Sequence, residues 1–169
     1  MGGKSSMTRT GTFQHLIERN GQALNVWNDL ARNGNVPVPL VPWGDAVSGF
    51  INQDYAILYY SSGGITAVKA GATNFTWDAA FLPAGPEGYG VESAGGDVHI
   101  LNNIPKVQQD AAWEWIKFLV APEQAAAWSA ASGYIAVNKG AFDTEVMKEA
   151  VSETPQFLVP VEQLQYGHP

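Results

Sequence analysis

The chain has 169 residues, enough for one domain with a real core, and 46% of them are hydrophobic, which indicates a folded globular protein. The formal net charge is -7 and the nine basic residues form no cluster, which argues against nucleic acid and anionic membranes as partners. The sequence contains no cysteine, which excludes disulfides, thiolate catalysis and cysteine-ligated zinc.

The N-terminal segment 1–10, MGGKSSMTRT, is small and polar and has no apolar h-region. We therefore expect no signal peptide in this chain and assign these residues, outside the fold, to a leader or to the edge of an excised fragment. Charged or polar residues also interrupt every apolar run, so no segment is expected to cross a membrane.

Residues 15–34 place apolar side chains at helical spacing, which predicts a helical segment. Within it, the pair Asn20 and Gly21 predicts a break into two pieces. Gly34 suits the position just after a helix end, because glycine adopts the left-handed backbone without strain.

The next segment, 36–42, carries prolines at alternate positions. This pattern forbids a helix and favours an extended connection at the surface. A short helix is expected after it, with Asp45 as its cap and Phe50 near its end.

Three apolar segments predict β-strands: 55–60 (YAILYY), 76–83 (TWDAAFLP) and 98–101 (VHIL). Residues 65–72 predict a short helix between the first two. Strands that alternate with helices indicate an α/β arrangement.

Pro105 suits the first turn of a helix that runs to about Val120. At 3.6 residues per turn, this helix has an apolar stripe that is expected to face the core. The stripe consists of Ala112, Trp115, Ile116 and Leu119.

A second helix is expected to start at Pro122, because the residue before a proline avoids the helical region and proline itself suits a first turn. Trp128 is expected to anchor its apolar face among alanines that let helices approach closely. Gly133 is expected to end it, and a last helix is predicted over about 143–152.

The stretch SSGG at 61–64 is the strongest local signal for a binding site. Backbone N–H groups at such a turn attract anions and hydroxyl oxygens, and small residues let a ligand reach them. Taken alone, the stretch is more often an ordinary capped turn, and it lacks the Gly-Lys-Ser/Thr of a Walker loop. The pair Gly95 and Gly96 indicates close approach of the backbone to a ligand, or a hinge.

Other chemistry finds little support in the residue pattern. The histidines show no ligand spacing, the carboxylates show no pairing for glycoside hydrolysis, and no Gly-x-Ser-x-Gly elbow is present. We therefore predict no metal site, no cofactor and no catalytic residue. Five aromatic residues are candidates for stacking on a sugar face, with the core as the alternative: Trp43, Tyr59, Tyr60, Tyr89 and Tyr134.

From about residue 22 to its end, the chain resembles the C-terminal half of family 1 extracellular solute-binding proteins of ATP-binding-cassette importers. The resemblance is carried by consecutive blocks: VWNDLARNGNVPVP, WGDAVSGFINQDYAILYYSSGG, AAFLPAGPEG, GGDVHI and AAWEWIKFLVAPEQAAAWSAASGYIAVNKGAF. It implies an α/β fold of the periplasmic-binding-protein type II, here partial, with a mixed sheet flanked by helices. Residues 11–94 and 140–169 would belong to one lobe and 95–139 to the other.

The resemblance also implies a function: capture of a small polyol, sugar or glycerophosphate-type ligand and its delivery to a membrane permease, without chemistry. The parent protein would lie outside the cytoplasm, in the periplasm or as a membrane-anchored lipoprotein.

The resemblance implies the following ligand contacts. Ser61, Ser62 and Gly63 would offer hydroxyl and N–H groups, and the Gly95–Gly96 pair would bring backbone N–H groups. Tyr134 would stack on the ligand or donate its hydroxyl.

The chain departs from the family in two respects. Ala136 stands where many relatives have a proline, and the resemblance covers only a C-terminal fragment that stops at YGHP. In glycerol-phosphate-binding relatives, an arginine that holds the phosphate follows a comparable tail. We therefore expect weak or no binding by the isolated fragment, and exposed apolar surface that favours a homodimer.

Two other classes of function stay open at this stage. One is a hydrolase of sugars or phosphoesters that uses carboxylates such as Glu92 or Asp97. The other is a structural or interaction module in which SSGG is only a turn.

Overall fold

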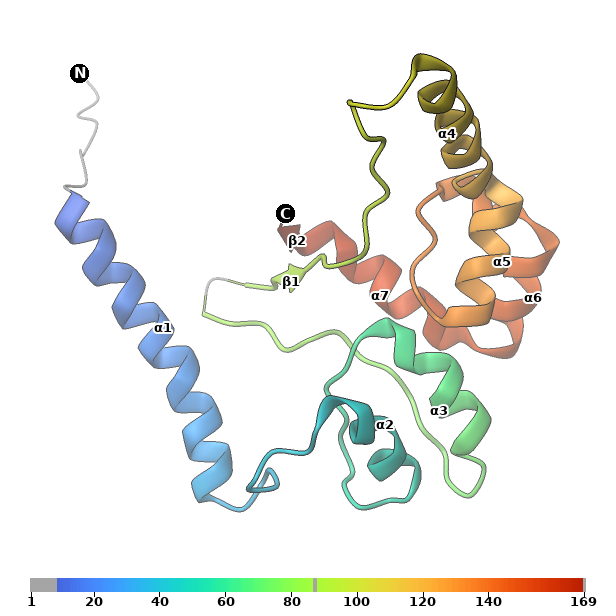
Figure 1. Ribbon diagram of the computed structural model, residues 1–169. Coiled ribbons are helices and arrows are strands. Elements are labelled where there is room, and N and C mark those ends of the chain that lie inside the picture. Colours follow the sequence, from blue (N-terminus) through green and yellow to red (C-terminus); the bar gives the residue numbers. More distant parts are fainter. Residues whose placement is uncertain (1–8, 87, 169) are drawn as a thin grey trace, which may run out of the picture. The chain divides into compact units, whose positions relative to one another are not determined.

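A computed structural model describes residues 9–86 and 88–168, with side chains described for 21–86 and 88–167. The first eight residues of the expected leader lie outside this part. The chain divides between Asp45 and Ala46 into two compact units, which are described separately below. Figure 1 labels the helices and strands in chain order.

The first unit contains one long helix, α1 (Arg9–Arg32). The predicted break at Asn20 and Gly21 is wrong, because the helix runs through both residues. A glycine inside a helix costs roughly 1 kcal/mol relative to alanine, but it removes no hydrogen bond. After α1, Gly34 has φ +73°, as expected of a residue that follows a helix end.

Residues 36–42 form the predicted irregular connection. Helix α2 (Trp43–Ile51) follows, and its first three residues belong to the first unit. Asp45 lies in the first turn rather than at the cap, where its carboxylate still favours the positive end of the helix dipole.

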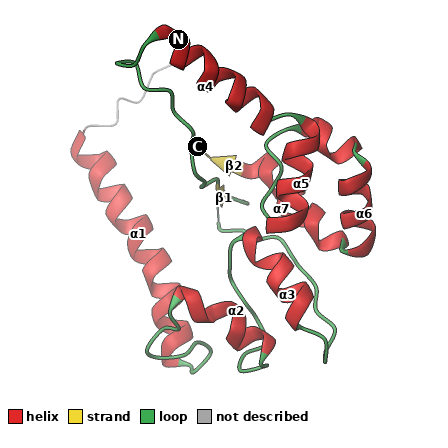
Figure 2. Ribbon diagram, turned by 45° about the vertical axis from the view of Figure 1, so that its right-hand side comes forward, coloured by secondary structure: helices red, strands yellow, loops and turns green. Residues whose placement is uncertain are grey.

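The second unit is mainly helical (Figure 2). Its α-helices are α3 (Ile65–Gly71), α4 (Lys106–Leu119), α5 (Pro122–Ser132), α6 (Glu145–Glu153) and α7 (Leu158–Gln163). Short 3₁₀ turns join them: η1 (Ser62–Gly64), η2 (Lys139–Asp143), η3 (Pro155–Phe157) and η4 (Leu164–Tyr166). The predicted helices at 65–72, 105–120 and 122–132 are confirmed to within two residues.

The strand predictions are wrong for 55–60, 76–83 and 98–101, which are irregular or extended in the structure. Among the described residues, the one sheet is a parallel pair of two-residue strands, β1 (Val91–Glu92) and β2 (Gly167–His168). The predicted mixed sheet is therefore not confirmed. An apolar extended segment becomes a strand only where a neighbouring strand pairs with its N–H and C=O groups.

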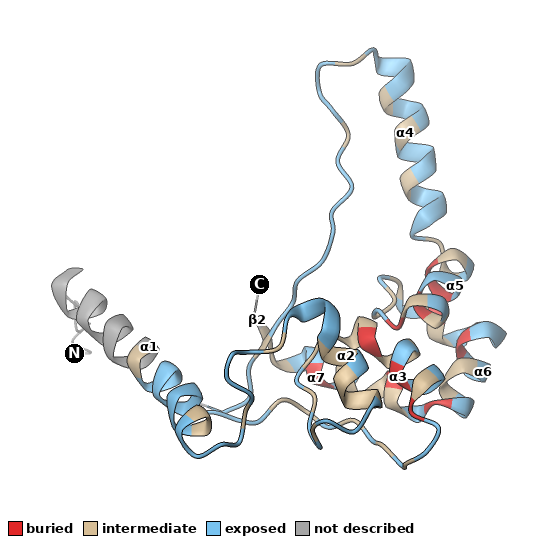
Figure 3. Ribbon diagram, turned by 60° about the horizontal axis from the view of Figure 1, so that its bottom comes forward, coloured by how far each residue is buried: buried red, intermediate tan, exposed pale blue. Residues whose placement is uncertain are grey.

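The core of the second unit lies between α5, η2 and α6, which pack side by side (Figure 3). It is built from small residues and one methionine: Ala125, Ala126, Ala141 and Met147. The alanines let the backbones approach closely, as predicted. The assignment of Trp128 to this face is wrong, since its side chain is 66% exposed. Ala125, Ala126 and Ser129 share one face of α5 at 3.6 residues per turn, and Trp128 falls off it.

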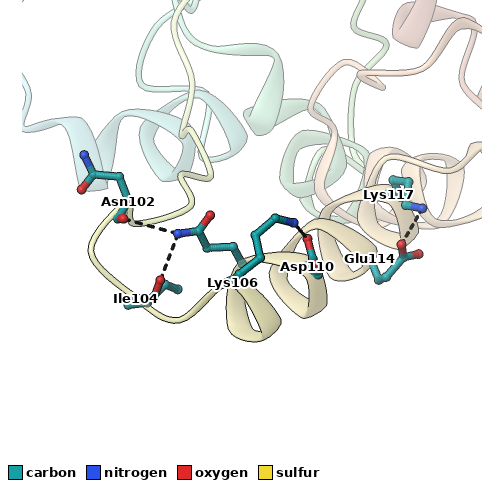
Figure 4. Close-up of polar contacts among 7 residues, drawn as sticks. Asn102, Ile104, Lys106, Asp110, Glu114 and Lys117 are labelled. Carbon is teal, nitrogen blue, oxygen red and sulfur yellow. Dashed lines mark hydrogen bonds and ion pairs between the residues drawn. The ribbon is translucent and has the colours of Figure 1, made fainter.

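Helix α4 also differs from its prediction, because no residue of it is buried within the described chain. Of the predicted apolar stripe, Ala112 and Ile116 are half-buried, whereas Trp115 and Leu119 are exposed. The start of α4 is held instead by polar contacts (Figure 4). The side-chain amide of Gln109 donates to the carbonyl oxygen of Ile104 at 3.0 Å.

Candidate functional site

The SSGG stretch forms a compact turn that leads into α3. Ser61 is the N-cap of η1, and its Oγ accepts a hydrogen bond from the Gly63 N–H at 3.3 Å. The Gly64 N–H donates to the carbonyl oxygen of Ser61 at 2.9 Å. The turn thus pairs two of its own N–H groups, and the Ser61 hydroxyl keeps its proton for a further partner.

The ring of Tyr134 packs directly on this turn. A Cβ atom added at Gly63 would lie 2.7 Å from Cζ of Tyr134 and 3.0 Å from both of its Cε atoms. These are the ring atoms nearest the hydroxyl, so the phenol end of Tyr134 lies against Gly63. Only a glycine leaves room for the ring here without a shift of one of the two. Tyr134 is 50% exposed, so the residue is also accessible to solvent.

The residues before Tyr134 approach the same turn. Gly133 ends α5 in the left-handed region, with φ +83°. A Cβ atom added there would lie 2.8 Å from the carbonyl oxygen of Ser62. The Thr66 hydroxyl of α3 donates to the carbonyl oxygen of Ser132 at 3.4 Å. Residues 61–66 and 132–134 are therefore joined, although they lie far apart in the sequence.

A buried serine fixes the backbone of Tyr134. The side chain of Ser129 on α5 is 1% exposed, and its hydroxyl donates to the carbonyl oxygen of Tyr134 at 2.6 Å. The Tyr134 N–H donates to Ser132 Oγ at 3.3 Å. Both backbone polar groups of Tyr134 are thus held by serines of the preceding helix.

A broad hollow in the second unit collects most of the predicted ligand contacts. Its volume is about 2050 Å³, far above the roughly 300–1,000 Å³ of a pocket for a small molecule, so it is an open depression. Five of the predicted site residues line it: Ser61, Ser62, Gly95, Gly96 and Tyr134. Side chains at Gly95 and Gly96 would meet no atom of the described chain within 4 Å, so their backbone is accessible.

Two predicted site residues stand apart from this group. Gly63 contributes as the surface on which Tyr134 packs. Trp43 begins α2 in the first unit, so its part in a site of the second unit stays a prediction. Sequence reasoning missed Ser129 and Thr66. The available signal for Ser129 was a serine in the last turn of a helix, a few residues before a glycine cap and an aromatic residue.

Among the described residues, no group of three metal-ligating side chains is close enough to hold an ion. Charged side chains of both signs line the hollow: Asp78, Glu92 and Lys139. The carboxylate of Asp78 accepts a hydrogen bond from the Gln156 amide at 3.0 Å. The hollow is therefore lined mainly by apolar and aromatic residues, with a few charged and hydroxyl groups among them.

The sequence profile of bacterial extracellular solute-binding proteins matches residues 4–157. The chain belongs to this family. No helix of this solute-binding protein, within the part that the structure describes, is long and apolar enough to span a bilayer. No curated protein matches the sequence significantly.

A solved structure agrees with the family assignment. The crystal structure of UgpB from Mycobacterium tuberculosis in complex with glycerophosphocholine is similar to this solute-binding protein, with a TM-score of 0.60 and 23% sequence identity. The match covers 73% of this chain and 31% of UgpB. The chain therefore spans about a third of the length of that protein. At this identity the likeness shows the fold, and it supports the predicted fold of a solute-binding protein.

Proposed function

We propose that the chain is part of the substrate-binding component of an ATP-binding-cassette importer. In this role it captures a small polyol, sugar or glycerophosphate-type ligand without chemistry. The observation that carries the proposal is the contact between Tyr134 and Gly63, because it brings a half-exposed phenol to a turn with two serine hydroxyls. Hydroxyl groups and an aromatic ring are what recognition of a polyol requires.

Each part of the proposed site has a distinct role. Ser61 and Ser62 supply hydroxyls from the turn. The Gly95–Gly96 pair, which lies later in the chain, supplies backbone N–H groups. Tyr134 donates its hydroxyl or stacks on an apolar face of the ligand. Trp43, which lies in the first unit, stays a sequence-based prediction for stacking on the ligand.

The ligand class follows from the chemistry of the hollow and from its solved relative. UgpB was crystallised with glycerophosphocholine, which combines a glycerol unit with a phosphodiester. We extend this class to the present chain, since hydroxyls, N–H groups and a phenol serve the glycerol part of such a ligand equally well.

The parent protein would act outside the cytoplasm and pass its ligand to a membrane permease. Residues 11–94 and 140–169 would form part of one lobe of a clamp, and 95–139 part of the other. The homodimer expected from the sequence has no support in the family match or the solved relative, and we do not propose it.

Calorimetric titration of the full-length parent protein with glycerophosphocholine, glycerol 3-phosphate and maltose tests the proposal, because weak or no binding is expected of the isolated fragment. At least one of the three should bind, and Ser61→Ala or Ser62→Ala should weaken that binding by about threefold to tenfold, the loss of one hydrogen bond. Ser152→Ala, on the exposed side of α6, is the matched control and should leave affinity unchanged. No heat with any compound would count against the proposal.

A hydrolase would give a different result. If the protein hydrolysed chromogenic glycosides or phosphoesters, and Glu92→Gln or Asp97→Asn abolished this activity, the protein would be a hydrolase and not a ligand-binding component. We expect no turnover above that of buffer.

A further inference from the structure

Ser129 stands out among the buried polar residues of the second unit. Serine hydroxyls inside helices usually donate back to the carbonyl four residues earlier, as Ser132 does to Trp128 at 2.7 Å. Ser129 instead donates forward, past the end of α5, to the carbonyl of Tyr134 at 2.6 Å. Ser129 is 1% exposed, so its hydroxyl is shielded from water.

The hydrogen bond from Ser129 holds Tyr134, which is the residue after α5 that the proposed site needs. Tyr134 follows a glycine in the left-handed region, where the chain leaves the helix. Without a tether, the backbone after such a cap is free to swing, and the half-exposed ring would sample several rotamers. The Ser129 bond fixes the backbone, and the contact with Gly63 then limits where the ring can lie.

We propose that Ser129 is a positioning residue, which holds the Tyr134 phenol over the Ser61–Gly64 turn before any ligand arrives. This inference rests on the proposed function. A ring that is ordered in advance loses little freedom on binding, so affinity is higher than for a mobile ring. Ser129 itself touches no ligand, because it is buried beneath the segment.

The first test reads the ring position in the free chain. In nuclear magnetic resonance spectra, cross-relaxation between the ring protons of Tyr134 and the α-protons of Gly63 should be strong in the parent chain. Ser129→Cys, which keeps the shape of the side chain with a somewhat larger atom and replaces a strong donor with a weak one, should weaken this signal at least twofold.

Thr154→Val is the matched control. Thr154 is also buried, and its hydroxyl has no partner in the described chain. The variant removes a buried hydroxyl elsewhere in the same unit and should leave the Tyr134 signal unchanged. An unchanged signal in Ser129→Cys would overturn the proposal, as would an equal loss in Thr154→Val.

The second test measures the affinity of the full-length parent protein for glycerophosphocholine. Ser129→Cys should weaken binding by about threefold to tenfold, the equivalent of one hydrogen bond. In a Tyr134→Ala background the same change should have no effect on affinity, because Ser129 acts through the ring. An effect that persists without the ring, or an unchanged affinity when the ring signal is lost, would overturn the proposal.

Two further outcomes are distinguishable. If the ring signal depends on Ser129 but neither glycerophosphocholine, glycerol 3-phosphate nor maltose binds, the positioning holds and the proposed function fails. If Ser129→Cys does not fold, a measurement on the unsubstituted chain still tests whether the hydrogen bond of Ser129 is present. Its Ser129 hydroxyl proton should exchange slowly with water, and rapid exchange would contradict the enclosed bond.

Discussion

The side-chain amide of Gln163 pairs with both backbone polar groups of Leu82. The Leu82 N–H donates to Oε1 of Gln163 at 3.0 Å, and Nε2 of Gln163 donates to the Leu82 carbonyl oxygen at 3.2 Å. Gln163 is buried at the end of α7, so this amide does for the extended segment 76–83 what a neighbouring strand would do. Leu82 is thereby held without a neighbouring strand.

We expect Gln163→Leu to destabilise the chain by about 1–3 kcal/mol, because both Leu82 groups lose their partner. Urea denaturation followed by tryptophan fluorescence measures the change. Gln165→Leu, the same substitution two residues further on at an exposed position, is the control and should have a much smaller effect. Equal losses of stability in the two variants would show that the hydrogen bonds between Gln163 and Leu82 contribute nothing.

Gly133→Ala should destabilise the chain by about 1–2 kcal/mol from the left-handed backbone alone. The added Cβ would also lie 2.8 Å from the carbonyl oxygen of Ser62, which must then move. Gly95→Ala is a suitable control, since its Cβ would enter open space. Thermal unfolding monitored by circular dichroism compares the two, and a Gly133→Ala protein as stable as the parent would contradict the description of this turn.

Met147→Ala should cost about 2–5 kcal/mol, because Met147 is 1% exposed at the centre of the core. Its neighbour Val146 is 47% exposed, and Val146→Ala should cost far less. Denaturant unfolding of both variants decides whether the core lies between α5 and α6. A larger loss for Val146→Ala would place the core elsewhere.

The ion pair between Lys69 and Glu153 ties α3 to the end of α6, with 2.7 Å between Nζ and Oε2. The hydrogen bond from Lys69, and then its charge, lower the pKa of Glu153. A carboxylate whose pKa is lowered by folding adds stability above its unfolded pKa and loses it as the pH falls through the folded value.

Lys69→Met should therefore lower the melting temperature slightly at pH 7, by the modest amount typical of an exposed pair. The difference from the parent chain should shrink as the pH is lowered from about 5 to about 2, since Glu153 becomes protonated in both proteins. Glu153→Gln should show the same behaviour. A gap that stays constant across this range would mean that the pair is not its cause.

Gly21→Ala should stabilise α1 by about 0.5–1 kcal/mol, because alanine loses less backbone freedom in a helix and its Cβ would enter open space. Gly34→Ala should have the opposite effect, since Gly34 has φ +73°. The helical signal in circular dichroism during thermal unfolding reports both changes. A loss of helical signal in Gly21→Ala would indicate that the helix is broken at Gly21, as the sequence had predicted.

Interactions between near neighbours made much of the fold predictable. Pro122 opens α5 and Gly133 closes it, both because of what their own backbones allow. The helical spacing at 65–72 and 105–120 produced α3 and α4 for the same reason. Ser61, Ser62, Gly95, Gly96 and Tyr134 were selected from local residue patterns together with the family resemblance, and the structure places them on one hollow.

Partners distant in the sequence decided the rest. Whether segment 76–83 becomes a strand depends on what pairs with its backbone, and here that partner is the Gln163 side chain. Whether Trp128 is buried depends on which face of α5 meets α6. The contact of Tyr134 with Gly63 was also beyond sequence reasoning, because α5 must first pack beside α3. Local chemistry sets where each helix begins and ends, whereas packing between helices determines which side chains meet.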